Sequence, residues 1–287
     1  MIRQSFLQVE EGFCCVVEHI PDVHRATLIL FSGFGQTKCE YAFFYSRLAK
    51  WMSQHGILTI QWDYRGHGDS SHQLEDITWH HLQNDACALM ASVVREYGHQ
   101  PLYLLGKGIG YTLASQMANA FPVNGALAFY PHVPRPGHVD VLLQTLGMAN
   151  EPVLNLADAL AAFKGFDSQL TPDEQRTLMY FQNLGGYPEN LKGQQVQAHF
   201  LRELDALAPD NVPCTVLLLA GHNDLMRDAR EEMMRQVQGE YQVRAFASGP
   251  THYLSADGLD NVILAVSSCL EEELYGHTFA TSQQLAP

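Results

Sequence analysis

Short hydrophobic runs alternate along most of this chain with longer segments in which hydrophobic residues recur every three or four positions. The longer segments, such as YAFFYSRLAKWMSQHG and LQNDACALMASVVREYG, predict helices. The short runs predict buried strands at Leu28–Phe31, Leu58–Trp62, Leu102–Leu105, Ala126–Tyr130 and Thr215–Ala220. Strands that alternate with helices form βαβ units, so we expect an α/β fold with a mostly parallel sheet that helices cover on both faces.

Two segments depart from this alternation. The N-terminal stretch SFLQVEEGFCCVVEHI predicts two strands joined by a Glu-Gly turn, hence an antiparallel hairpin. Between about residues 131 and 210 the pattern changes to proline-rich and turn-rich sequence with several helical stretches. We therefore predict a core of residues 1–130 and 211–275, a helical cap insertion over 131–210, and a polar, aperiodic tail at 276–287 that frays.

Composition limits the possible functions. The 287 residues carry 31 acidic and 17 basic side chains, a net charge of −14, which disfavours contact with phosphate backbones and therefore nucleic-acid partners. No stretch predicts a membrane span, and the first residues lack the apolar core of a signal peptide. Six irregularly spaced cysteines form no disulfide framework or paired metal motif, so we expect a cytoplasmic protein without metal or cofactor.

A glycine-rich turn lies in LYLLGKGIGYTLASQMA, between a predicted strand and a predicted helix. Such a layout is typical of a dinucleotide-binding loop or of a nucleophile elbow, a sharp turn that raises one reactive side chain above a sheet. The dinucleotide interpretation is disfavoured because Tyr111 occupies the third glycine position and the next strand ends without an acidic residue. The elbow interpretation requires small residues two positions before and after the central one, and Gly106 and Gly110 meet it.

Four further segments follow in a consistent order around this turn: FSGFGQT, WDYRGHGDSS, LLLAGHNDLM and ASGPTHYL. With the elbow, they resemble the α/β-hydrolase superfamily from about Thr27 to the last predicted helix, apart from the cap. The resemblance implies a doubly wound, mostly parallel sheet of about eight strands and a small-molecule substrate. It also implies Asp224 as the triad acid, His252 as the triad histidine, and the backbone N–H groups of Phe34 and Ile109 as the oxyanion donors.

The central elbow position is the decisive departure from that family, because Gly108 stands where the family has serine. The serine mechanism therefore cannot be transferred. The remaining histidine and oxyanion donors would support an enzyme that acts on a small ester, thioester or carbonyl substrate without an acyl-enzyme, with a water molecule in the space that serine would fill. Two alternatives remain open: a catalytically silent binding protein, and an inactivated form of a serine esterase or thioesterase.

Other residues in these segments also predict contacts at or near the site. Lys107 either presents a cation to an acidic ligand or lies at the rim of the site. Ser32 and Gly33 lie in the segment that resembles the family's oxyanion loop, and we expect them, with Lys107, to contact the substrate. Ser32 is also the least unsuitable candidate for a relocated nucleophile. We expect Asp63 and Arg65, in the WDYRGHGDSS segment, to form an internal ion pair with each other.

Overall fold

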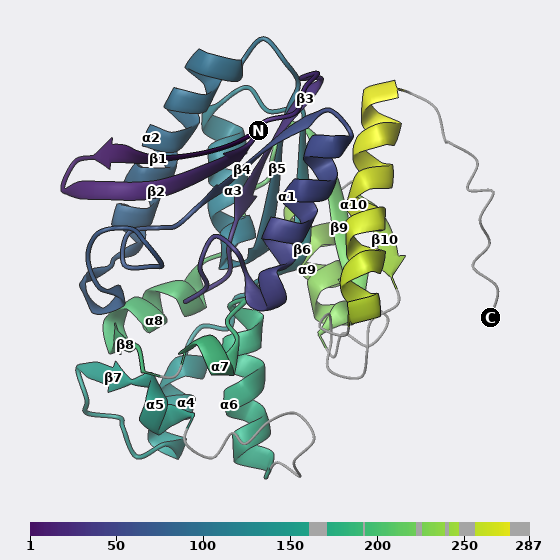
Figure 1. The fold of residues 1–287 in the computed structure, drawn as a ribbon. Helices are drawn as coiled ribbons and strands as arrows, with labels where there is room; N and C mark the ends of the chain where they lie inside the picture. The colour runs from purple at the N-terminus through teal and green to yellow at the C-terminus, as the bar shows by residue number, and fades with distance from the viewer. Residues whose placement is uncertain (161–170, 192, 222–225, 239–240, 247–255, 276–287) are drawn as a thin grey trace.

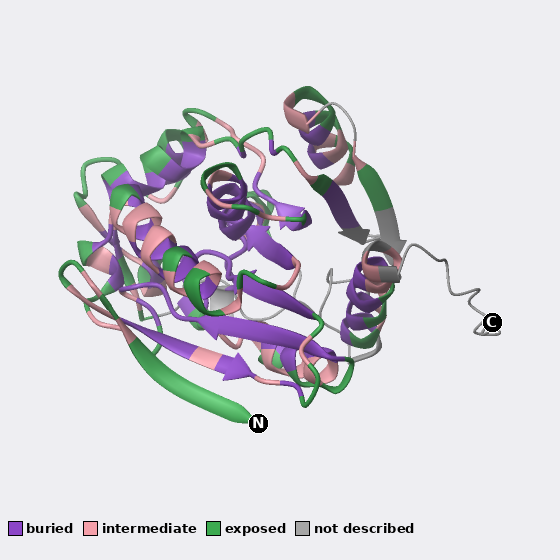
Figure 2. Cartoon of the chain, turned by 90° about the horizontal axis from the view of Figure 1, so that it is seen from above, coloured by how far each residue is buried: buried purple, intermediate pink, exposed green. Residues whose placement is uncertain are grey.

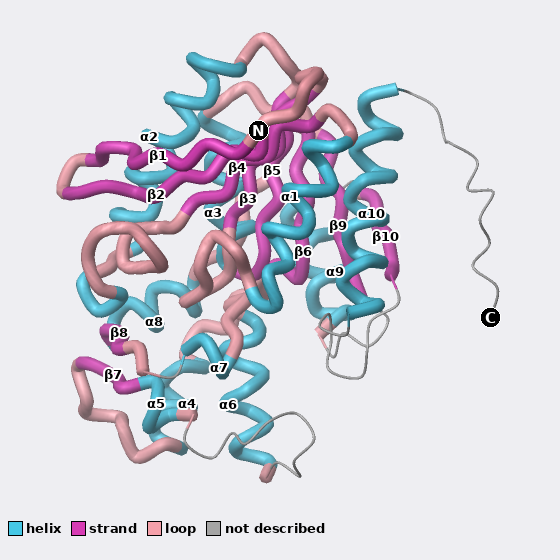
Figure 3. Tube along the Cα trace, viewed as in Figure 1, coloured by secondary structure: helices cyan, strands magenta, loops and turns pink. Residues whose placement is uncertain are grey.

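The computed structural model describes residues 1–160, 171–191, 193–221, 226–238, 241–246 and 256–275. One sheet of eight strands runs through the molecule in the order β1-β2-β4-β3-β5-β6-β9-β10, and all its pairs beyond β2·β4 are parallel (Figure 3). Its strands are β1 (Ile2–Val9), β2 (Gly12–His19), β3 (Ala26–Phe31), β4 (Ile57–Trp62), β5 (Leu102–Gly108), β6 (Gly125–Pro131), β9 (Thr215–Gly221) and β10 (Gln242–Phe246). The chain thus has the α/β-hydrolase fold that the sequence predicts.

Helices cover both faces of this sheet (Figure 1). Helices α1 (Phe44–Gln54) and α10 (Ala256–Tyr275) lie on one face, and α2 (Trp79–Tyr97), α3 (Ile109–Ala120) and α9 (Arg227–Gln238) lie on the other. Alternate residues of β3 supply the two layers: Leu28 and Leu30 pack with α1 and α10, whereas Ile29 and Phe31 pack with α2 and α3. Burial on both faces explains why the central strands read as continuous hydrophobic runs.

The predicted hairpin is confirmed, since β1 pairs antiparallel with β2 over its whole length. Strand β1 forms the edge of the sheet and is mostly exposed, whereas the central strands are buried (Figure 2). Leu7 and Val9, on one face of β1, pack against the core, whereas Ile2 and Phe6 on its other face are exposed. Short 3-10 turns, η1 (Tyr41–Phe43) and η2 (Leu74–Asp76), lie in the connections that follow β3 and β4.

The described residues between β6 and β9 (132–160, 171–191 and 193–214) leave the sheet and form a separate layer, which we call the insertion (Figure 1). Its described elements are α4 (His138–Thr145), β7 (Val153–Asn155), α5 (Leu156–Ala159), α6 (Pro172–Asn183), α7 (Pro188–Leu191), β8 (Gln195–Gln197) and α8 (Ala198–Ala206). Strands β7 and β8 pair antiparallel with each other and not with the main sheet. Within the described part of the chain, no helix is long and apolar enough to cross a membrane.

Candidate functional site

Gly108 lies at the sharp turn between the end of β5 and the start of α3. Its backbone has φ 55° and ψ −126°, a left-handed conformation that glycine adopts without the steric cost of a Cβ atom. Backbone also crowds the two flanking glycines: a Cβ on Gly106 would lie 2.3 Å from Tyr111 Cα, and one on Gly110 would lie 2.4 Å from the Phe31 carbonyl oxygen. The spacing of the three glycines is therefore a packing requirement of this turn.

The backbone N–H groups of Phe34 and Ile109 both donate to the carbonyl oxygen of Leu184, at 3.0 and 3.2 Å. These are the two donors that the sequence resemblance assigns to an oxyanion. The structure does bring them together, on one oxygen atom, but that oxygen belongs to the insertion. In this structure both N–H groups are therefore already satisfied.

Leu184 can fill this position because it caps the carboxyl end of α6. The N–H groups of Gly185 and Gly186 return to the carbonyls of Gln182 and Phe181, at 2.9 and 2.8 Å, in the pattern of a Schellman motif with Gly185 at φ 83°. The Leu184 carbonyl is then free to point out of the helix end. Ile109 is the first residue of α3, so the partly negative carboxyl end of α6 meets the partly positive amino end of α3.

The insertion also fills the space at Gly108. A Cβ on Gly108 would lie 2.3 Å from the Leu184 oxygen and 2.4 Å from the Gly185 nitrogen. On the opposite side, a Cβ on Gly33 would lie 2.2 Å from the Gly185 oxygen. The expected water molecule has no room here, because the backbone of the insertion occupies the place where it would stand.

A buried polar cluster holds this part of the insertion on the sheet. Asn183 donates to the Val133 carbonyl at 2.8 Å, accepts from the Val133 N–H at 3.0 Å, and lies 3.0 Å from Nδ1 of His132. The guanidinium of Arg230 donates to the Pro131 carbonyl beside it. Burial and the nearby Arg230 charge lower the pKa of His132 to about 3, so its ring is neutral at pH 7.

Lys107 lies neither at a rim nor in contact with solvent. Its ammonium donates to the Glu40 carboxylate at 2.5 Å, and both side chains are 1% exposed. The other oxygen of Glu40 accepts from the N–H of Gly33 at 2.7 Å. The ion pair therefore braces the loop after β3 against β5, which corrects both of the roles proposed for Lys107 from the sequence.

Ser32 is buried and its hydroxyl donates to the Thr37 carbonyl at 3.2 Å. Its own carbonyl accepts from the Tyr64 hydroxyl at 2.9 Å. These bonds fix the loop and give the hydroxyl a structural role. Gly33 allows the close approach of the insertion described above, so in this structure it contacts Gly185 where a substrate was expected.

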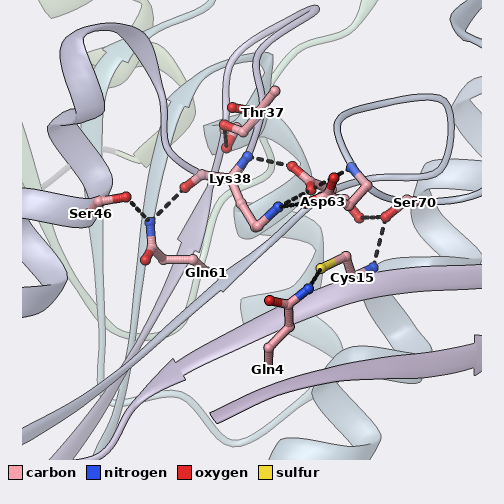
Figure 4. Close-up of polar contacts among 10 residues, drawn as sticks. Gln4, Cys15, Thr37, Lys38, Ser46, Gln61, Asp63 and Ser70 are labelled. Carbon is pink, nitrogen blue, oxygen red and sulfur yellow. Dashed lines mark hydrogen bonds and ion pairs between the residues drawn. The ribbon is translucent and has the colours of Figure 1, made fainter. Parts of the chain in front are cut away.

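The predicted ion pair between Asp63 and Arg65 is wrong. Arg65 makes a buried bidentate pair with Asp85, at 2.7 and 2.5 Å, whereas Asp63 accepts from the backbone and the ammonium of Lys38 at 2.5 and 2.6 Å (Figure 4). The two side chains leave the turn in different directions, toward α2 and toward the loop after β3. The Asp85 carboxylate therefore ties α2 to this turn, and the Asp63 carboxylate ties the turn to the loop after β3.

Cys15, Asp63 and Asp69 bring a thiol and two carboxylates within 4.8 Å of one another, a geometry that could hold a metal ion. The ammonium of Lys38, however, lies 2.6 Å from both carboxylates. Burial raises the pKa of the Cys15 thiol, which opposes the thiolate form that binds metals. A protein cation therefore already bridges the two carboxylates.

Asp224 and His252 lie outside the described residues. The strands that precede them are neighbours, since β9 and β10 pair in parallel and Gly221, at the end of β9, is in register with Phe246, at the end of β10. The carboxyl ends of β9 and β10 therefore lie at the same edge of the sheet as Gly108.

The contact that closes the site, Leu184 with Gly185, was not identified from the sequence. Its local signal is present, because Asn-Leu-Gly-Gly after a helical stretch marks a glycine C-cap. Such a cap indicates that a carbonyl at the end of the helix needs a hydrogen-bond donor, but it does not identify that donor. The partner N–H groups lie about 75 and 150 residues away along the chain, so only the folded arrangement identifies them.

Comparison with known proteins agrees with this fold. The family model of serine aminopeptidase, S33, matches residues 22–133. Among solved structures, alpha/beta hydrolase domain-containing protein 10 from mouse is 16% identical, with a TM-score of 0.64 over 94% of this chain and 99% of its own. A soluble variant of monoglyceride lipase from Saccharomyces cerevisiae is 14% identical, with a TM-score of 0.67 over 94% and 95%. No curated protein matches in sequence.

Proposed function

We propose that this chain is a catalytically silent binding protein on the α/β-hydrolase fold, in which the former hydrolase site has become a contact between core and insertion. The observation that carries the proposal is the Leu184 carbonyl, which accepts from both Phe34 and Ile109. A carbonyl oxygen in this place resembles the oxyanion that the two donors would otherwise stabilise. In addition, Gly108 has no side chain, so the position below the Leu184 carbonyl carries no nucleophile.

The alternative is an enzyme that uses His252 as a base without a serine. One observation favours it: β9 and β10, the strands that precede Asp224 and His252 in the sequence, pair in parallel and end side by side. In that case the insertion must withdraw from Gly33 and Gly108 before any substrate reaches the two N–H groups. The two candidates therefore differ in whether His252 matters for turnover.

The test is to measure turnover of short and long acyl esters, acyl thioesters and lactones by the wild type and by the His252→Ala variant. A silent protein is expected to show the same background rate for both. If the wild type turns over any of these compounds and His252→Ala lowers that rate by about 10²-fold or more, the protein uses a general base and the silent function is wrong.

A further inference from the structure

Strand β1 forms one edge of the eight-stranded sheet, and its outer side has no partner strand in the described part of the chain. Figure 2 shows this strand exposed at the rim of the molecule. An exposed edge can pair with a strand of another chain, and proteins commonly prevent this with lysine, proline or a β-bulge. The β1 sequence IRQSFLQV has no lysine or proline, and its pairing with β2 has no bulge. The edge is therefore open to a further strand.

The pairing of β1 with β2 identifies the backbone groups that face outward. The Ile20 N–H donates to the Met1 carbonyl at 2.8 Å, and the Met1 amino group donates to the Ile20 carbonyl at 2.7 Å. Opposite residues in antiparallel strands alternate between pairs that exchange hydrogen bonds and pairs that do not. Since Met1 and Ile20 continue the register of the two strands, odd-numbered residues bond to β2. The N–H and C=O groups of even-numbered residues, from Ile2 to Gln8, therefore point away from β2.

The side chains at this edge are apolar at alternate positions. Ile2 is 68% exposed and Phe6 is 53% exposed, and both lie on the face of β1 that does not pack on the core. The Phe6 ring meets Phe13 of β2 edge to face, with centroids 5.2 Å apart. Residues 1–9 include no acidic side chain, although the whole chain has a net charge of −14. A matching partner is therefore a strand that also carries apolar side chains at alternate positions and no repelling charge.

A second copy of β1, antiparallel to the first, is such a strand. A twofold axis at Gln4 places Ile2 of each copy opposite Phe6 of the other, on the same face of the sheet. Gln4 then lies opposite Gln4, and Arg3 lies opposite Ser5. Apolar side chains meet apolar ones and polar side chains meet polar ones, without opposing like charges.

Neighbouring registers lack this match. An axis at Arg3 would place two guanidinium groups opposite each other, which is destabilising. An axis at Ser5 would place both apolar side chains opposite glutamines. An axis at Phe6 would place Ile2 opposite Glu10, in the turn after β1. The sequence of the strand therefore selects a single register.

We propose that two copies of this chain form a reversible dimer through β1, with one continuous sheet across a twofold axis at Gln4. At Ile2, Gln4 and Phe6, each copy donates an N–H group to the other copy and accepts one from it. A single pair of edge strands is a small interface, so the dimer should dissociate on dilution. The proposal is independent of the silent function, because β1 contributes no contact to the junction at Gly108.

The first test is sedimentation equilibrium of the full chain over a wide range of concentration. We expect the mass to rise from that of the monomer to that of the dimer, with a Kd of about 10–100 μM. A monomer up to about 500 μM, well above that range, would overturn the proposal and leave the edge to a strand of a different protein. A mass that rises beyond the dimer would also overturn it, because a twofold contact closes after two copies.

Gln4→Pro and Gln8→Pro are matched variants that locate the contact. Each proline removes an outward N–H group and no bond to β2, a placement that edge strands tolerate. Only Gln4 lies within the paired residues 2–6. Gln4→Pro should weaken the dimer at least about tenfold, and Gln8→Pro should leave Kd within about twofold. Equal effects of the two variants, at equal stability to urea, would overturn the register.

Amide hydrogen exchange tests the contact without a substitution. In a sample that is mostly dimeric, the N–H groups of Gln4 and Phe6 should exchange at least about fivefold more slowly than in a dilute monomeric sample. The outward N–H of Gln8 is the internal control and should exchange at the same rate in both. Unchanged exchange at Gln4 and Phe6 in a dimeric sample would place the contact elsewhere and overturn the proposal.

Discussion

The insertion meets the core at two places that differ in how closely the two parts approach each other. At Gly108 the Leu184 carbonyl receives two backbone N–H groups, and glycines on both sides allow backbone to touch backbone. At the second place, a cavity of about 390 Å³ remains open between residues 66–75 of the core and residues 193–195 of the insertion. The first junction resembles a site already occupied by its own chain, whereas the second leaves open space between the core and the insertion.

This difference has a simple physical origin. Donors at the start of α3 and carbonyls at the end of α6 have no partner within their own helices, so each helix end supplies what the other lacks. The cavity walls are instead the connections after β3 and β4 and residues 193–195, before and in β8.

The largest effect is expected at the closed junction from Gly108→Ser. The new side chain meets the Leu184 oxygen and the Gly185 nitrogen, and it must also adopt a positive φ. We expect a loss of roughly 2–4 kcal/mol in the free energy of unfolding, measured by urea titration, because the insertion must shift. We also expect no gain of esterase activity from this change alone. A variant of wild-type stability that hydrolyses esters would contradict the closed site.

A pair of glycines compares the two junctions directly. Gly185 at φ 83° belongs to the closed junction, and Gly193 at φ 88° belongs to the cavity wall. Alanine at either position must adopt a left-handed backbone at a cost of about 1 kcal/mol. Only at Gly185 does the added Cβ meet other backbone, at 2.9 Å from Gly33 Cα and 3.0 Å from Gly108 Cα.

Gly185→Ala should therefore lower the free energy of unfolding by about 2 kcal/mol more than Gly193→Ala. Urea titration of the two variants side by side measures the difference. Equal losses would mean that the contact of Gly185 with Gly33 and Gly108 contributes nothing to stability.

A third effect, which appears only when the pH falls, concerns His132 in the closed junction. Its folded pKa of about 3 lies below the ordinary 6.5, so between these values the unfolded chain takes up a proton that the folded chain does not. Stability from this residue is constant above about pH 6.5 and falls as the pH falls toward 3. The loss at pH 5 is about 2 kcal/mol.

Urea titrations at pH 7 and pH 5 test this by comparing the wild type with His132→Asn, whose amide oxygen can still accept from Asn183. The variant should lose about 2 kcal/mol less than the wild type between the two pH values. His80→Asn, at an exposed position, is the control for general acid effects. An identical pH dependence in wild type and His132→Asn would show that His132 titrates as in the unfolded chain.

The sequence by itself determined the fold class, the hairpin and the strand–glycine–helix turn, because hydrophobic period and glycine spacing report local geometry. It also determined that Gly108 cannot act as a nucleophile. Only the tertiary structure decided the partners. Arg65 pairs with Asp85 and not Asp63, Lys107 is buried against Glu40, and Leu184 occupies the donors of Phe34 and Ile109. Each of these contacts joins segments distant in sequence, and the energy of a charge or an unpaired N–H group depends on what folding brings beside it.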